Sequence, residues 1–154
     1  MLLALFVLLI LVLGWFCYQN LKVNTSPTKE NTIILKFENL KKELFLKSKI
    51  WGVSGNHEEI VLSINQTGIV NHEIDYVFYT SEIYFKIING CTLIIYAPES
   101  GISEPKIPFR NVKIIVNGLR NYDDIRNYRI NYQKYGLTKA SVYNQSTPNL
   151  TSPK

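Results

Sequence analysis

The sequence predicts a mainly β protein in which an N-terminal transmembrane helix precedes one antiparallel β-sheet or sandwich domain with a single late helix. Three observations carry this prediction. They are a charge-free N-terminal run, alternation of apolar and polar residues from Thr32 onward, and one stretch with helical periodicity. The chain has 154 residues, which leaves enough for one small domain after the N-terminal run. We therefore expect four segments: a signal anchor at 1–19, a linker at 20–31, a globular domain at 32–143 and a disordered tail at 144–154.

The run from Leu2 to Tyr18 has the composition of a membrane-spanning helix. It contains no charged residue and, at about 1.5 Å per residue, it reaches the short end of what crosses a hydrocarbon core of roughly 30 Å. Trp15 and Phe16 near its end are aromatics of the kind that favour the membrane interface. We predict an uncleaved single-pass anchor that contacts the lipid bilayer through residues 2–18.

Other interpretations of this run stay open. A cleavable signal peptide carries a basic start and a small-residue cleavage site, whereas Met1 leads directly into leucine here. A lipid anchor on Cys17 needs small residues before the cysteine, and Trp15 and Phe16 occupy those positions. A buried core helix of a soluble protein is rarely so uniformly apolar.

The segment after the linker carries strand patterns almost to its end. The linker itself is polar and contains Pro27. Alternating or β-branched segments then follow, and we expect about six or seven strands among the candidate segments 33–37, 44–50, 60–64, 76–78, 82–87, 91–96, 112–116 and 140–143. Asn89-Gly90 predicts a type I′ hairpin turn. The strand at 112–116 is expected to end at Asn117-Gly118.

One amphipathic helix is predicted at 121–135. Its apolar side would be a stripe formed by four residues at i, i+3, i+7 and i+10, which are Ile125, Tyr128, Tyr132 and Tyr135. Asn121 suits the N-cap, and Gly136 suits the end of the helix. We expect the tyrosine stripe to face the core.

The tetrapeptide G-N-H-E at 55–58 resembles part of the two-metal site of calcineurin-like phosphoesterases. In that family it works beside D-x-H and G-D motifs and further histidines. This chain has three aspartates, none in a D-x-H, and two histidines, His57 and His72. A two-metal centre needs more carboxylate and imidazole ligands than these. We interpret the match as coincidence.

A single metal site is the alternative. His57, Glu58 and His72 are ligand types that zinc accepts, and a small metal-dependent hydrolase could use them. If strands 58–64 and 74–80 pair as a hairpin, however, the two histidines lie at opposite ends of it. No G-x-S-x-G elbow and no glycine-rich phosphate loop occurs in the sequence. We therefore predict a non-enzymatic protein with no catalytic, cofactor-binding or metal-binding residues.

Positive charge is concentrated in the C-terminal third. Residues 105–139 hold eight Lys and Arg against two Asp, within a net charge of +5 for the chain. The cations near the tyrosine stripe fit an anionic surface or an envelope protein as partner, and they are Arg120, Arg126, Arg129 and Lys134. Solvated side chains are the simpler interpretation, and we expect no nucleic-acid partner.

The stretch Ser48 to Ser63, S-K-I-W-G-V-S-G-N-H-E-E-I-V-L-S, resembles a segment of small uncharacterised bacterial envelope proteins that are membrane-anchored or lipoprotein-like. The resemblance covers residues 40–143 and departs at the start, where a basic region and a lipobox are missing. It implies a location rather than an activity, and it favours an extracytoplasmic domain. Lys22 and Lys29 after the run favour a cytoplasmic domain instead. Together the sequence predicts a membrane-anchored interaction module of the cell envelope.

Overall fold

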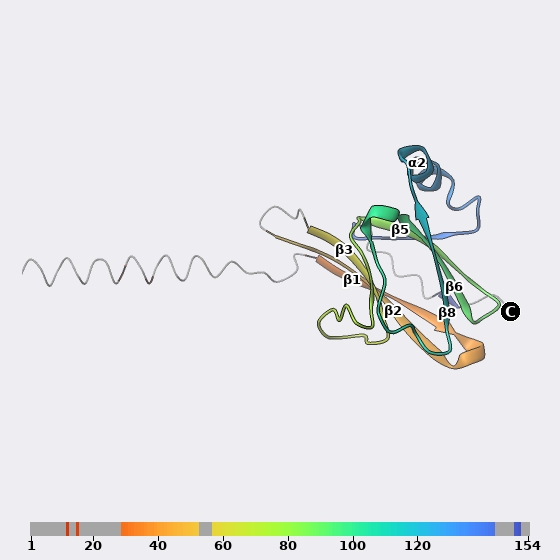
Figure 1. Cartoon of the computed structure of the whole chain (residues 1–154), viewed down its shortest axis with the longest axis horizontal. Helices are drawn as coiled ribbons and strands as arrows, with labels where there is room; N and C mark the ends of the chain where they lie inside the picture. Colours follow the sequence, from red (N-terminus) through yellow and green to blue (C-terminus); the bar gives the residue numbers. More distant parts are fainter. Residues whose placement is uncertain (1–11, 13–14, 16–28, 53–56, 144–149, 152–154) are drawn as a thin grey trace, which may run out of the picture.

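Two β-sheets face each other across an apolar core in the computed structural model, which describes residues 12, 15, 29–52, 57–143 and 150–151 (Figure 1). The first sheet has the order β10-β1-β2-β3-β4-β7, formed in that order by Leu150–Thr151, Lys29–Phe37, Lys42–Trp51, His57–Ser63, Tyr76–Phe78 and Ile102–Ser103. The second has the order β8-β6-β5-β9, formed by Lys113–Leu119, Thr92–Pro98, Glu82–Ile88 and Thr138–Ser141. Two short 3-10 helices, η1 (Glu38–Leu40) and η2 (Glu99–Gly101), and one α-helix, α2 (Tyr122–Asn131), complete the described part. The predicted mainly β fold with one late helix is confirmed.

The core between the sheets follows from the alternation in the sequence. Leu35 pairs with Leu44 and Ile33 with Leu46, so their side chains share the inner face of the first sheet. The inner face of the second sheet is contributed by every other residue of β5 and β6: Ile83, Phe85, Leu93 and Ile95. All of these side chains are at most 5% exposed, and burial of each stabilises the fold by about 1.5–3 kcal/mol.

Most strand pairs are antiparallel, as predicted, but both sheets are mixed and not purely antiparallel. β6 and β8 are parallel, from Thr92 beside Lys113 to Pro98 beside Leu119. Parallel neighbours need a long crossover, and the residues between Pro98 and Lys113 supply one. Since the register continues to Leu119, the predicted end of this strand at Asn117-Gly118 was wrong.

The edges of the first sheet also differ from expectation. β1 begins at Lys29, before the predicted end of the linker at Asn31. β10 lies within the predicted disordered tail and pairs in parallel with β1 at Leu35 and Lys36. Such short additions to a sheet edge carry little sequence signal, because two residues cannot display alternation.

The β5–β6 hairpin closes as predicted. Asn89 and Gly90 have φ angles of 52° and 62°, and the Cys91 amide donates to the Ile88 carbonyl over 3.3 Å. These are the features of a type I′ turn, whose twist matches that of the two strands.

The ends of α2 are capped by the expected residues. The side chain of Asn121 accepts a hydrogen bond from the Asp124 amide at 2.8 Å. After Asn131 the chain continues in turns until Gly136, whose φ is 66°. There the amides of Gly136 and Leu137 donate to the carbonyls of Gln133 and Tyr132, each over 2.9 Å. This pair of bonds is a Schellman motif, so the helical path does stop at Gly136 although α2 itself ends earlier.

The tyrosine stripe of α2 packs outside the core, which corrects the predicted orientation of the helix. No residue of α2 is buried. Tyr128 contacts Tyr96 with ring centroids 4.8 Å apart, and Tyr132 contacts Tyr84 at 5.7 Å. Tyr84 and Tyr96 are directly paired and point away from the inner core. The helix therefore covers the outer face of the second sheet, where its tyrosine rings pack against those of Tyr84 and Tyr96.

Of residues 2–18 the structure describes Val12 and Trp15, both helical and with 59% and 66% of their surfaces exposed. Among all described residues, no helix has the length and apolar character needed to cross a bilayer. The predicted anchor as a whole lies outside the described residues.

Candidate functional site

The two histidines lie at opposite ends of the β3–β4 pair. His57 begins β3, whereas His72 is exposed in the turn before β4. Leu62 pairs with Tyr76 and Ile60 with Phe78, so His72 lies near the Ser63 end of β3. That end is about 20 Å from His57 at roughly 3.3 Å per residue. The pairing predicted from the sequence is confirmed, and it does not bring the imidazoles together.

The carboxylates beside His57 point to different faces of the sheet. Glu58 accepts a hydrogen bond from the Tyr143 hydroxyl. Glu59 is 6% exposed on the other face and forms an ion pair with Lys49 at 3.1 Å. Within the described ranges, no three His, Cys, Asp or Glu side chains are grouped to hold a metal ion. The structure thus separates the residues on which the metal-dependent alternative relies.

The basic residues around α2 are partly neutralised. Arg129 binds the Glu82 carboxylate, which also lies 3.5 Å from Lys139, and Arg120 binds Glu99 at 3.2 Å. Carboxylates therefore neutralise two of the four cations considered as a binding surface. Arg126 and Lys134 form no ion pair with any described residue.

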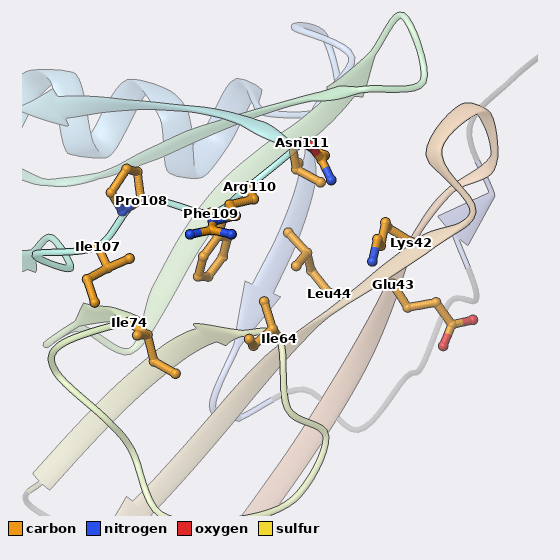
Figure 2. Close-up of a pocket in the computed structure, with 11 residues that line it drawn as sticks. Lys42, Glu43, Leu44, Ile64, Ile74, Ile107, Pro108, Phe109, Arg110 and Asn111 are labelled. Carbon is orange, nitrogen blue, oxygen red and sulfur yellow. The ribbon is translucent and has the colours of Figure 1, made fainter.

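A groove of about 540 Å³ lies at one end of the sandwich (Figure 2). This size is within the usual range for ligand sites. The groove is lined by four separate parts of the chain, namely Lys42–Leu44 at the start of β2, Ile64 after β3, Ile74 before β4 and the segment Ile107–Val112. Lys42 pairs with Phe37 at the end of β1, so the groove is about 26 Å along the strand from Lys29.

Apolar side chains form the floor and walls of the groove. Leu44 and Val112 are buried at its base, and Phe109 packs edge-on against Tyr76 with centroids 5.5 Å apart. Ile64 and Ile107 remain 50% and 54% exposed at its rim. Exposed aliphatic residues gathered around a concavity are typical of a binding surface.

Local bonds hold the groove wall in place. The Ile107 amide donates to the Glu73 carbonyl at 2.9 Å, and the Lys106 ammonium binds the Glu73 carboxylate at 2.6 Å. Glu73 belongs to a turn in which its own amide donates to the Asn71 side chain at 3.0 Å. At the other end of the segment, the Lys113 amide donates to the Cys91 carbonyl at 3.0 Å. The wall is therefore attached to both sheets.

Two cations lie at the rim without a countercharge. Figure 2 shows Lys42 directed towards Leu44, Arg110 beside Phe109, and the Glu43 carboxylate directed away from the groove. Glu43 is 3.7 Å from Lys36, outside the groove. Lys42 and Arg110 form no ion pair with any described residue. The groove thus combines an apolar interior with net positive charge at its mouth.

Sequence reasoning missed this site because its residues are far apart in the chain. Lys42, Ile64, Ile74 and Phe109 meet only when the strands pair. The available signal was Ile107 and Phe109, which are large apolar residues in a proline-broken segment outside any strand pattern.

Comparison of the chain with protein-family models, with curated proteins and with solved structures found no match.

Proposed function

We propose that this protein is a membrane-anchored, non-catalytic interaction domain of the cell envelope, and that the groove between Lys42 and Arg110 is its binding surface. The observation that carries the proposal is the combination of an apolar groove with two unpaired cations at its rim. Such a surface complements a ligand in which a carboxylate lies next to an aliphatic or aromatic group. A short segment of another protein has this composition.

The location of the groove supports the same function. The N-terminal run leads into β1 at Lys29, and the groove lies at the other end of β1. With the run in a bilayer, the groove faces away from the membrane and can be reached by other envelope proteins. The helical, exposed Val12 and Trp15 agree with an anchor, since large apolar residues exposed to water are costly. We place the domain outside the cytoplasm, as the resemblance to envelope proteins suggests.

Photo-crosslinking in cells tests the proposal. We expect p-benzoylphenylalanine at Ile107, on the rim, to give a specific adduct with another protein. The same probe at Ile69, which is 95% exposed and outside the groove, is the control and should give none. Charge reversal by Lys42→Glu with Arg110→Glu should reduce the Ile107 adduct about tenfold or more, because like charges repel an acidic ligand. Equal adducts at Ile107 and Ile69 would refute the proposed function. An Ile107 adduct of unchanged yield after the double charge reversal would also refute it.

A further inference from the structure

β8 is the longest of the four outermost strands among those that the structure describes. β8 is the outermost strand of the second sheet and runs over seven residues, Lys113–Leu119. The other outermost strands are shorter, with four residues in β9 and two each in β7 and β10. Proteins normally protect edges by shortness, proline, bulges or inward charges. β8 has no proline, and its single charge is at Lys113, where the strand begins.

Three of the seven residues of β8 direct their backbone groups off this edge. The Lys113 amide donates to Cys91 in the neighbouring chain segment, and the parallel register then alternates along the strand. Lys113, Ile115, Asn117 and Leu119 therefore direct their N–H and C=O groups towards β6. Ile114, Val116 and Gly118 direct theirs outward, where no described strand pairs with them. These groups are a ready template for another strand.

The side chains of the edge favour an apolar partner with acidic ends. Ile114 and Val116 are half-buried against the core, and Ile115 is half-buried on the opposite face. An added strand would extend apolar rows on both faces. Lys113 forms no ion pair with any described residue, and the groove cation Arg110 precedes it by three residues. The wall of the groove thus leads directly into the open edge.

We propose that β8 binds an extended segment of a partner protein as a fifth strand of the second sheet, with an acidic residue of that segment beside Lys113 and Arg110. The inference rests on the proposed function, since it gives the mode by which the groove ligand is held. Main-chain hydrogen bonds would supply affinity, and the groove would select the side chain and charge at one end.

A second copy of this chain fits the edge less well. Antiparallel self-pairing through β8 relates the copies by a two-fold axis normal to the sheet. Such an axis reverses the direction of β1, so the two copies of Lys29, where β1 begins, would lie at opposite ends of the pair. A second β8 also has no acidic residue to place beside Lys113 and Arg110, and we therefore assign the edge to a different protein.

Proline at position 116 in the full-length, membrane-bound chain tests the inference. Val116→Pro removes an outward amide that forms no hydrogen bond with any described residue, and edge strands tolerate such a loss. Val116→Thr keeps that amide and a β-branched side chain, and it is the matched control. With p-benzoylphenylalanine at Ile115 on β8, we expect an adduct that Val116→Pro reduces at least tenfold and Val116→Thr leaves unchanged. The melting curves of the two variants should be alike.

The outcomes separate this inference from the proposed function. If the yield of the Ile107 adduct is unchanged in Val116→Pro, strand addition is overturned, whereas the groove is retained as the binding surface. An Ile115 adduct sensitive to proline, with none at Ile107, would support strand addition without the groove. An Ile115 adduct with twice the mass of the chain would show self-pairing and overturn the assigned partner. Absence of an adduct at Ile115, with the probe incorporated and the chain folded, would also overturn it.

Discussion

The Glu82 carboxylate in β5 links the second sheet to α2 through an ion pair with Arg129. Its side chain is 12% exposed and accepts from Arg129, with Lys139 at 3.5 Å. Burial alone raises the pKa of this carboxyl, but the hydrogen bond from Arg129 and the charges of Arg129 and Lys139 outweigh that effect and lower it. The adjacent Tyr84 is buried beside the Glu82 carboxylate, and both conditions raise the pKa of its phenol. Tyr84 therefore stays neutral while Glu82 stays charged.

We predict that Glu82→Gln lowers the free energy of unfolding by about 1 kcal/mol at pH 7. This value is the usual contribution of a hydrogen bond between charged groups, reduced because Arg129 is partly exposed to solvent. Because the folded pKa of Glu82 lies below its unfolded value, this stabilisation is present above the unfolded pKa. It is lost as the pH falls through the folded pKa. Urea unfolding at pH 7 and pH 3 should show the difference between wild type and variant shrinking at the lower pH.

The matched control is Glu73→Gln. It breaks the Lys106–Glu73 pair, whose side chains are 75% and 54% exposed, and exposed pairs contribute about 0–1 kcal/mol. An equal loss in both variants would show that Glu82 contributes no more than an exposed ion pair. A pH-independent loss for Glu82→Gln would show that Glu82 does not act through its charge.

At the scale of single elements, the β5–β6 hairpin is attached to the turn after β1. The Asn39 side chain donates to the Asn89 carbonyl at 3.2 Å, and a Cβ on Gly90 would overlap the Asn39 amide. Gly90 therefore satisfies two requirements, a positive φ and close approach of another side chain.

We expect Gly90→Ala to lower the free energy of unfolding by about 1–2 kcal/mol for the left-handed backbone, with a further loss as Asn39 is displaced. Gly136→Ala is the comparison, since Gly136 has φ 66° against 62° for Gly90, and its added Cβ would meet nothing within 4 Å. Denaturant melts of the two variants should therefore differ by about 0.5–1.5 kcal/mol, the net value of one hydrogen bond. Equal losses would mean that the Asn39 contact contributes nothing.

Elements specified by local chemistry were predictable from the sequence. Asn89-Gly90 specified the hairpin, and Asn121 and Gly136 specified the limits of the helical path. Asn89, Gly90 and Gly136 act through a positive φ, and Asn121 acts through its capping side chain. The parallel pairing of β8 was not predictable, since β-branched residues do not reveal which strand lies beside them. Gly118 looked like a strand end, yet Glu99 packs over it where a side chain would not fit.

Neither the orientation of α2 nor the presence of the groove could be predicted without the complete tertiary structure. Tyrosine at helical spacing indicates one covered face but not which surface covers it, and here that surface is the pair Tyr84 and Tyr96. The groove depends on strand register, which brings Lys42 and Arg110 to one mouth. Neither residue has a neighbour in sequence that marks it as special.

For the molecule as a whole, the direction of β1 relates the ends of the chain to the proposed binding surface. The strand starts at Lys29 and ends at Phe37 beside Lys42, so the start of β1 and the groove lie at opposite ends of this strand. A tether at one end and a binding surface at the other suit a domain that reaches outward from a membrane. This arrangement has functional meaning only if residues 2–18 are embedded.

We predict that the full-length protein stays in the membrane pellet after carbonate washing, because Leu2 to Tyr18 presents only uncharged residues to the lipid. Protease added to intact spheroplasts should digest the domain, as expected for an extracytoplasmic location. The paired substitution Leu8→Arg with Leu9→Arg places two charges mid-run, each costing about 2.5–3.5 kcal/mol at a helix centre, and should release the protein. Leu8→Ile with Leu9→Ile keeps the apolar character and should behave as wild type. Release of the wild-type chain by carbonate would disprove the anchor, whereas a pelleted but protease-protected domain would keep the anchor and reverse its orientation.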